Sequence, residues 1–398
     1  PNGVDIKMER NSYGFNSEYH LHNATIDKFK LEYERSFYDH KEYESKGLIG
    51  AQFRFVSNSV RFELLQHQGS ILKNGYWGIA ISKKDNKLGG LVFIPNNSYL
   101  VYSPYMNEEI SLTNSLTAKL GVRYEAAKID LASPYVFQSS IYKNLEFNSV
   151  SSSVSLDYKV DENMKLNVNV SQSNRVPEPE ELFSDGPHLA AYSYDIGNPN
   201  LKLEKSMSYA FNAEYNTEKL RFTSELFYYD YSNYITPTAT GDTNYSTLLP
   251  IYRQVNMPAK LYGLNLSLAY DLTEKLSASS NMSYTIGKEK LTGHYLPLIP
   301  PLTMNVDLEY KLTDWQFKLN AILTSSQEDL GQFEQRTDGY IVLNAEVKKN
   351  FNIDNELLTV IGSVNNITNE TYRNHLSRIK SVYPQPGIGA ELTVNLYL

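Results

Sequence analysis

The 398-residue chain contains no cysteine, and this absence excludes both a disulfide framework and a thiolate metal site. It also lacks any run of about 18 apolar residues, which argues against membrane-spanning helices. The mean hydropathy is only −0.43, and 41% of the residues are hydrophobic. Such a composition is still compatible with membrane-spanning β-strands, because half of each spanning strand faces a wet lumen.

The sequence has no excess of basic residues and no short motif of a common enzyme class. Its 45 acidic residues outnumber its 37 basic ones, and the net charge of −8 argues against a nucleic-acid partner. It contains no Gly-x-Ser-x-Gly, His-Glu-x-x-His, P-loop or dinucleotide fingerprint, and no nucleophile–base pair can be nominated. We therefore expect a chain that is not an enzyme.

What the sequence does contain is an alternation of apolar and polar residues that recurs from end to end. In the segment 304–310, apolar side chains point to one face, and polar side chains such as Asp307 and Glu309 point to the other. Tyrosine is abundant, at 32 residues, and its amphipathic ring suits a membrane–water interface. These features predict an all-β fold, a transmembrane antiparallel β-barrel with a polar lumen. An array of soluble β-sandwiches is the alternative.

The alternation divides the chain into about 17 strands separated by short turns and long connections. The predicted strands are 10–21, 27–42, 51–67, 77–87, 98–112, 116–127, 148–159, 164–174, 206–215, 220–235, 261–272, 276–287, 304–312, 315–324, 339–349, 357–366 and 389–398. The predicted long connections are 127–146, 173–206, 231–260, 287–303, 324–338 and 366–388. Short periplasmic turns alternating with long outer loops are typical of outer-membrane barrels, and a barrel of this size encloses a wide lumen.

Several segments in order resemble the TonB-dependent outer-membrane receptors. Residues 116–130 are similar to a mid-barrel strand with the sequence Gly-x-Arg-Tyr-Glu, and residues 364–398 to the terminal hairpin. Residues 171–215 carry an Arg-x-Pro, Glu-Leu, Gly-Pro-His and Gly-Asn-Pro series that is the most recognisable stretch of the family. The segments 227–235 and 256–272 resemble the strand pair that follows. Each likeness is weak alone, but the order and spacing make them strong together.

The resemblance implies that residues 1–398 form one domain, the C-terminal part of a barrel of about 22 strands. Nothing in the chain resembles the plug domain that closes the lumen in this family, or the TonB box before it. The strand count is odd, and the chain begins at Pro1 without a signal-peptide pattern. We therefore expect the plug and the first strands to be absent, cleaved or supplied by another chain.

The function implied by the resemblance is active uptake of a scarce ligand across the bacterial outer membrane, with TonB and membrane lipid as partners. The Gly186-Pro187-His188 sequence and the 374–377 segment are most similar to receptors for metals, including zinc. No resident cofactor is required, and a bound metal such as zinc would be cargo. A plugless barrel that serves as a structural or docking component of an envelope complex and a passive diffusion channel are the alternatives.

The connection with the Gly-Pro-His sequence carries the densest set of candidate ligand-binding groups. It contains Glu181, Asp185 and His188, and imidazole with carboxylate suits a borderline cation such as Zn²⁺. His294 and His375 fall on other long connections of the same expected outer side. We hypothesise that His188 and His375 hold a metal or a metal complex. The alternative is that His188 caps or hydrogen-bonds its own loop.

A second group of polar residues is predicted to line the lumen. They lie on the polar faces of predicted strands, and the set comprises Arg123, Glu125, Arg221, Glu225, Asp307 and Glu309. In a plugged receptor such side chains hold the plug by ion pairs and hydrogen bonds. The alternative is a solvated wall in which the charges pair with one another.

Overall fold

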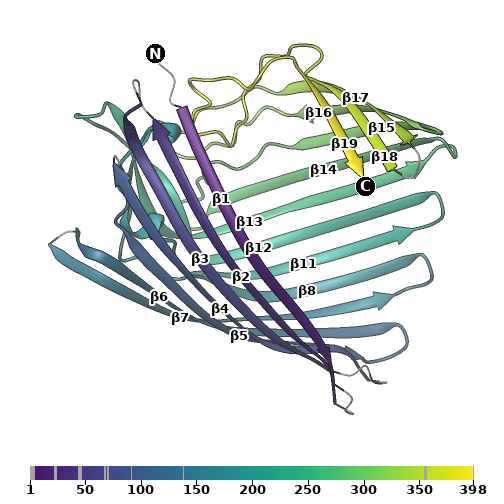
Figure 1. The fold of residues 1–398 in the computed structure, drawn as a ribbon, viewed down its shortest axis with the longest axis horizontal. Coiled ribbons are helices and arrows are strands. Elements are labelled where there is room, and N and C mark those ends of the chain that lie inside the picture. The colour runs from purple at the N-terminus through teal and green to yellow at the C-terminus, as the bar shows by residue number, and fades with distance from the viewer. Residues whose placement is uncertain are drawn as a thin grey trace. The chain divides into compact units, whose positions relative to one another are not determined.

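The computed structural model describes residues 5–21, 25–43, 47–66, 69, 71–90, 92–137, 139–353 and 356–397. This part of the chain is nearly all-β and forms one 19-stranded, predominantly antiparallel sheet (Figure 1). The strands in chain order are β1 Asp5–His20, β2 Ile26–Tyr43, β3 Ile49–Gln66, β4 Leu72–Gly90, β5 Asn97–Ser111, β6 Leu116–Phe137, β7 Ser140–Lys159, β8 Met164–Arg175, β9 Asp185–His188, β10 Ser193–Ile196, β11 Glu204–Asn216, β12 Leu220–Asn244, β13 Leu249–Asp271, β14 Leu276–Glu289, β15 Thr303–Leu312, β16 Trp315–Thr324, β17 Tyr340–Ile353, β18 Glu356–Asn365 and β19 Gly389–Tyr397. The helical elements are α1 Pro179–Phe183 and the 3₁₀ turn η1 Leu189–Ala191.

Each of the 17 predicted strands is present, so the all-β prediction is confirmed. The two additional strands, β9 and β10, are four residues each and lie with α1 and η1 inside the predicted connection 173–206. No helix in the described part of the chain is long and apolar enough to cross a membrane.

Two of the predicted long connections are wrong, because the flanking strands continue through them. β6 runs to Phe137 and β7 begins at Ser140, within the predicted loop 127–146. β12 runs to Asn244 and β13 begins at Leu249, which reduces the predicted loop 231–260 to a short turn. The Pro and Gly residues of these segments suggested loops, but β-branched and aromatic residues between them sustain the strands.

The chain divides into two compact units. The first contains residues 1–157, 169–208 and 230–259, and the second contains residues 158–168, 209–229 and 260–398. In the first unit, β1 to β6 each pair with the next strand along the chain (Figure 1). In the second unit, β14 to β19 pair in the same sequential way.

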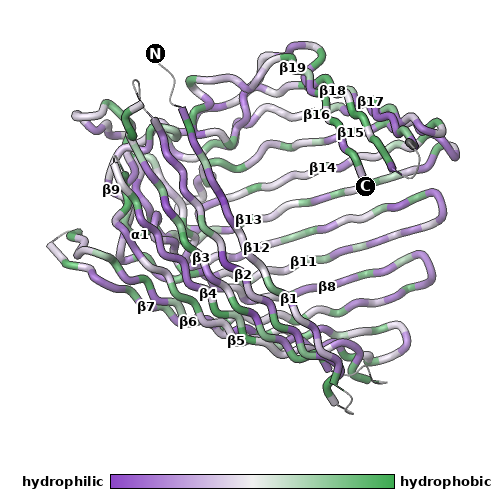
Figure 2. Tube along the Cα trace, in the orientation of Figure 1, coloured by the Kyte–Doolittle hydropathy of each residue, from purple (hydrophilic) through white to green (hydrophobic). Residues whose placement is uncertain are grey.

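The register of the sheet matches like with like across neighbouring strands. In the pair β15–β16, Leu308 lies opposite Leu319, and Asp307 lies opposite Asn320. Hydrophilic and hydrophobic residues alternate along the strands (Figure 2). The apolar face is open to its surroundings, with Leu308 and Phe317 each 40% exposed, as expected where lipid covers it.

The short turns are fixed by side chains that accept backbone hydrogen bonds. The Thr113 hydroxyl accepts from the N–H groups of Ser115 and Leu116, and Thr273 does the same for the turn before β14. The carboxylate of Asp161 accepts two such bonds before β8. The Asp, Asn and Thr content of these turns predicted this chemistry.

The first unit also has a small hydrophobic core on one face of the sheet. Ile129 and Leu131 of β6 are buried there beneath Leu182 and Phe183 of α1, all at 6% exposure or less. These β6 positions share a face with Arg123, so this face changes along the strand from polar to apolar. The segment between β8 and β11 folds onto the sheet because it covers this apolar part of β6.

Candidate functional site

An arginine fork fixes the segment between β8 and β11. Arg175, the last residue of β8, donates to both carboxylate oxygens of Glu181 at 2.8 and 3.0 Å. It also donates to both oxygens of Glu204, at 3.2 Å each. A Glu204 oxygen accepts in addition the backbone N–H of Ile235 at 2.8 Å. Planar bidentate pairs of this kind are strong and directional, so Arg175 ties β8, α1, β11 and β12 together.

The helix α1 is a single turn closed by its own acidic residues. Glu178 and Glu181 form a reciprocal capping box, with the Glu178 N–H donating to Glu181 at 2.8 Å. The backbone of Gly197 lies directly against the end of α1, where an added Cβ would be only 2.6 Å from the Leu182 carbonyl carbon. Burial, reinforced by the nearby charges of Glu180 and Glu181, raises the pKa of Glu178.

The strands β9 and β10 form a small hairpin that holds His188. The Nδ1 atom of His188 lies 3.1 Å from Oδ2 of Asp195, and the imidazole stacks on Phe93 with ring centroids 4.8 Å apart. The His188 side chain remains 37% exposed, whereas that of Asp195 is 13% exposed. Asp185, on the same hairpin, accepts a hydrogen bond from the Tyr194 hydroxyl at 3.1 Å.

The His188–Asp195 pair has the geometry of a metal-binding histidine supported by a carboxylate. Metal-ligating histidines usually donate the second ring N–H to such a carboxylate, which fixes the tautomer and leaves the other nitrogen to the metal. The half-exposed ring of His188 can therefore offer one coordination position. Glu181, the other predicted ligand on this segment, instead has both carboxylate oxygens engaged by Arg175.

In the second unit, a buried ionic cluster surrounds His375. Its Nε2 atom lies 3.0 Å from Oε1 of Glu334, and its Nδ1 atom lies 3.0 Å from the Thr337 hydroxyl. Lys380 donates to the same Glu334 oxygen at 2.8 Å and to the His375 carbonyl at 2.8 Å. The side chains of His375, Glu334 and Lys380 are 1%, 6% and 8% exposed.

Glu334 joins three connections of this unit. Its carboxylate accepts the backbone N–H groups of Leu298 and Gly331 at 3.0 Å each, in addition to the His375 and Lys380 bonds. Burial opposes the charge, but the bonds from His375, Lys380 and the backbone outweigh it and lower the pKa of Glu334 to about 2. Both ring nitrogens of His375 face protein groups, so in this arrangement neither is open to a metal.

The remaining predicted histidine lies on a turn. His294 is exposed, and its backbone N–H donates to the Thr292 hydroxyl at 3.2 Å. His188 belongs to the first compact unit, and His294 and His375 belong to the second. Within the described residues, no group of three or more His, Asp or Glu side chains is arranged to hold a metal ion.

The predicted wall residues all take part in pairs on the polar face. Arg123 pairs with Glu125 two residues along β6 at 3.0 Å, and Glu309 pairs in the same way with Lys311 at 2.7 Å. The other wall contacts join different strands. They are Arg221 with Asp271 at 3.4 Å, Glu225 with Asn265 at 2.9 Å, and Asp307 with Lys318 at 3.1 Å and Asn320 at 2.9 Å.

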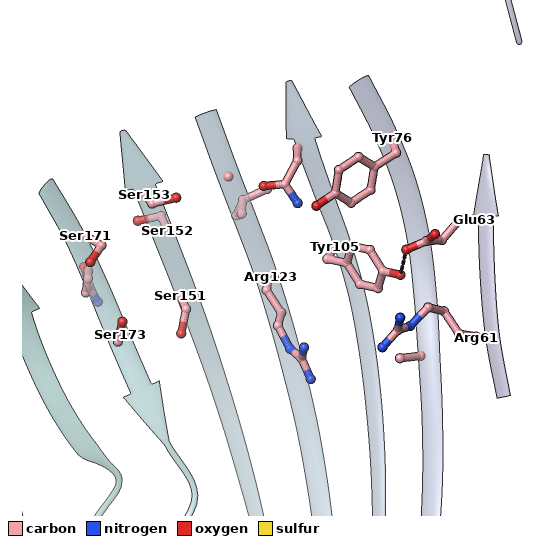
Figure 3. Close-up of a pocket in the computed structure, with 15 residues that line it drawn as sticks. Arg61, Glu63, Tyr76, Tyr105, Arg123, Ser151, Ser152, Ser153, Ser171 and Ser173 are labelled. Carbon is pink, nitrogen blue, oxygen red and sulfur yellow. Dashed lines mark hydrogen bonds between the residues drawn. The ribbon is translucent and has the colours of Figure 1, made fainter. Parts of the chain in front are cut away.

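A cavity of about 410 Å³ opens on the polar face of β3 to β8. Figure 3 shows that the labelled side chains approach it from neighbouring strands. The lining side chains are mostly hydroxyls and amides with three charges, and they include Arg61, Glu63, Tyr76, Tyr105, Asn107, Arg123, Ser151, Ser153, Ser171 and Ser173. The sequence prediction named only Arg123 among them.

Other residues of these clusters were missed as well. Arg175 and Glu204 lie in the stretch with the family likeness, where the Arg-x-Pro start was the available signal. Glu334 and Lys380 had no such signal, because each is an ordinary charged residue in a predicted loop. The cavity had none either, since its lining residues come from six separate strands.

Comparison with known proteins identifies the class. The family model described as "TonB dependent receptor-like, beta-barrel" matches residues 2–367, and the chain belongs to this family. Members of the family are receptors of the bacterial outer membrane that work with TonB, which places this chain in that membrane.

Curated relatives match part of the chain, two of them as follows. The iron-regulated outer membrane virulence protein of Vibrio cholerae serotype O1 (El Tor Inaba N16961) is 28% identical over 155 residues, which is 36% of this chain and 24% of that protein. The heme/hemopexin utilization protein C of Haemophilus influenzae (strain 86-028NP) is 25% identical over 195 residues, 44% of this chain and 27% of that protein. The matches thus span about a quarter of each relative.

Solved structures share the fold over nearly the whole chain. The copper transporter OprC superposes with a TM-score of 0.83 at 15% identity, covering 98% of this chain and 66% of that one. The FrpB iron transporter from Neisseria meningitidis (F5-1 variant) superposes with a TM-score of 0.72 at 14% identity, covering 97% and 63%. At these identities the likeness establishes the fold alone.

Proposed function

We propose that the chain forms the wall and outer loops of an outer-membrane receptor that takes up a scarce metal-containing ligand, driven through TonB. Membership of the TonB-dependent receptor family supports the transport role. The names of similar proteins, which include iron, copper and heme proteins, support a metal-containing ligand. The metal is cargo, the receptor needs no resident cofactor, and the chain performs no covalent chemistry.

The observation that carries the ligand assignment is the contact between His188 and Asp195. A carboxylate-supported, half-exposed imidazole stacked on an aromatic ring supplies one oriented metal ligand. A bare zinc ion requires three or four protein ligands, and no group of three is arranged for this among the described residues. We therefore infer that the ligand arrives as a preformed metal complex with one exchangeable position, rather than as a free ion.

An uptake experiment in metal-starved cells tests this proposal. The complete receptor is expressed with or without TonB, and accumulation of radiolabelled haemin, zinc chloride and copper chloride is measured. We expect TonB-dependent uptake of haemin and little uptake of the free ions. The variant His188→Ala should reduce haemin uptake about tenfold or more, because the metal loses its protein ligand. His20→Ala is the matched control, since His20 is an exposed strand residue.

The outcomes separate the alternatives. Uptake that is equal with and without TonB would indicate a passive channel and would overturn the receptor assignment. Free ions taken up better than haemin would reject the preformed complex. Haemin uptake that is unchanged in His188→Ala would remove His188 from the site and leave the receptor role intact.

A further inference from the structure

A positive charge stands on the apolar face of the second unit. Lys349 of β17 lies directly opposite Trp315, the first residue of β16, and the next pair on this face is Val347 with Phe317. Lipid covers this face of an outer-membrane barrel, and a charge on it is tolerated only near the edge of the bilayer. Trp315 follows directly on a short turn, and short turns lie on the periplasmic side. Lys349 therefore lies where the apolar face meets the periplasmic water.

The ammonium group of Lys349 is held between two aromatic rings. Its Nζ atom lies 4.6 Å from the ring centroid of Trp315 and 4.5 Å from that of Phe351. Trp315 in turn stacks on Phe317, with centroids 5.9 Å apart and the ring planes within 10° of parallel. Cation–π attraction fixes the position of the ammonium, but the rings carry no charge of their own. The positive charge is therefore ordered without being neutralised.

The lysines on the polar face of the neighbouring strands are compensated, whereas Lys349 is not. Lys311 of β15 pairs with Glu309 at 2.7 Å, and Lys318 of β16 pairs with Asp307 at 3.1 Å. Within the residues that the structure describes, no carboxylate forms an ion pair with Lys349, whose contacts are the two rings. Its charge is thus available to an anion that approaches along the apolar face.

Trp315 adds a second donor beside this ammonium. An indole N–H can only donate, and that of Trp77 on β4 donates to the carboxylate of Glu108 at 3.0 Å. The indole N–H of Trp315 has no such acceptor in the described part of the chain, and its side chain is 39% exposed. One anionic oxygen-rich group could therefore accept from both Lys349 and Trp315.

An apolar surface continues from Lys349 across the next two strands. Val360 of β18 lies opposite Lys349, and Val394 of β19 lies opposite Val360. Leu392 and Leu396 flank Val394 on the same face, and the three are 54–71% exposed. A molecule that pairs with Lys349 while covering this surface must carry an anionic head and long apolar chains.

We propose that Lys349 and Trp315 bind the phosphate of an anionic glycerophospholipid in the periplasmic leaflet, with its acyl chains against β18 and β19. A zwitterionic headgroup such as phosphocholine carries its own cation, which competes with Lys349 for the phosphate. Phosphatidylglycerol has no such cation, so its charge complements that of the lysine. The site is specific for headgroup charge, which distinguishes it from general contact between the barrel and lipid.

Lipid binding to the complete receptor tests the proposal. The receptor is purified in detergent, stripped of lipid and titrated with dioleoyl phosphatidylglycerol or dioleoyl phosphatidylcholine, and bound lipid is counted by native mass spectrometry. Lys349→Gln removes the charge, and Lys348→Gln is its control on the opposite face of the same strand. Trp315→Phe removes the free indole donor, and Trp77→Phe is its control. Heat-modifiable migration in gels verifies that each variant is folded.

We expect the parent to bind phosphatidylglycerol about fivefold more tightly than phosphatidylcholine, the scale of one lysine at a membrane surface. Lys349→Gln should abolish this preference, and Trp315→Phe should weaken phosphatidylglycerol binding about threefold, as for one lost hydrogen bond. Both controls should match the parent.

Three results would overturn the proposal. They are equal binding of the two lipids by the parent, a preference that survives in Lys349→Gln, and an equal loss in Lys348→Gln. Displacement of phosphatidylglycerol by millimolar glycerol 3-phosphate, beyond that by ammonium acetate of the same ionic strength, would also reject the lipid in favour of a soluble phosphate. Because no uptake is measured, the test is independent of TonB and of His188.

Discussion

The Nε2 atom of His375 lies 3.0 Å from Oε1 of Glu334, although the two residues belong to different connections of the sheet. Lys380 completes the cluster. The side chains of His375, Glu334 and Lys380 are almost fully buried. The Glu334 carboxylate is buried with two basic partners and two backbone N–H donors, so it stabilises the surrounding connections only while it is charged. The stability of these connections should therefore depend on pH.

We expect the connections around Glu334 to loosen in acid. The pKa of Glu334 is lowered to about 2 from an ordinary 4.5, so its contribution is complete above pH 4.5 and is lost as the pH falls toward about 2. The difference corresponds to roughly 3 kcal/mol. Hydrogen exchange of residues 325–339 and 366–388 at several pH values measures this. Glu334→Gln should show fast exchange already at neutral pH.

Glu328→Gln is the matched control for that experiment. Glu328 lies in the same connection, but its side chain is 69% exposed and its ion pair with Arg336 spans 4.0 Å. Exposed pairs of this kind contribute little to stability. Equal protection in Glu334→Gln and Glu328→Gln would contradict a stabilising role for the buried cluster.

Replacing Arg175 by lysine should destabilise the segment between β8 and β11 while keeping the charge. Lysine cannot reproduce the fork that reaches both oxygens of Glu181 and of Glu204. We expect a loss of about 2–3 kcal/mol, the scale of charge-assisted hydrogen bonds in a half-buried site. The temperature at which the heat-modifiable band unfolds measures it. Arg10→Lys, with one side-chain bond to Ser36, should change this temperature little.

Gly197→Ala should displace the end of α1. The added Cβ would lie within 2.7 Å of backbone atoms of Leu182, Phe183 and Ser184, which cannot rotate away as a side chain can. A cost of about 1–3 kcal/mol follows from such overpacking. Gly362→Ala is the control, because its Cβ would meet nothing within 4 Å. Limited proteolysis between β8 and β11 compares the two, and equal cleavage rates would contradict the prediction.

Asp195→Asn should weaken the metal complex without removing the His188 ring. The amide cannot stabilise the imidazole N–H as the carboxylate does, and losses of such supporting groups typically cost about 10–100-fold in affinity. Spectroscopic titration of the complete receptor with haemin measures the change. Asp185→Asn is the matched control, because the Asp185 carboxylate lies in the same hairpin and accepts from the Tyr194 hydroxyl. Identical titrations for both variants would argue against the His188 site.

The strands could be predicted from the sequence because their signal is local. Alternation and turn residues lie within each hairpin, as in the pairing of Leu308 with Leu319, so the pattern locates every long strand. The signal fails at 231–260, where Pro and Gly residues suggest a loop but the flanking strands continue to Asn244 and from Leu249. Strand ends are decided by pairing with a neighbour, which a single segment does not encode.

The clusters could not be predicted, because their members come together only in the fold. Arg175 and Glu204 are 29 residues apart, and Glu334 and Lys380 are 46 residues apart. The residue types suggested Glu181 and His375 as ligands. In the fold, however, Glu181 is bound by Arg175 and His375 contacts Glu334. The contact between His188 and Asp195 is local by comparison, because the two residues are only seven positions apart. The metal-binding role of His188 stays a prediction.

The sequential pairing of β1 to β6 and of β14 to β19 has a consequence for how the protein is made. Between β1 and β6 each strand is joined to its neighbour by a turn of a few residues, so the entropy lost on closing each loop is small. Between β14 and β19 such short turns alternate with longer connections, as at 325–339, and the closure entropy rises only slowly with loop length. Such a sheet can grow by adding one hairpin at a time at the membrane, because each strand can pair as soon as the strand before it is in place.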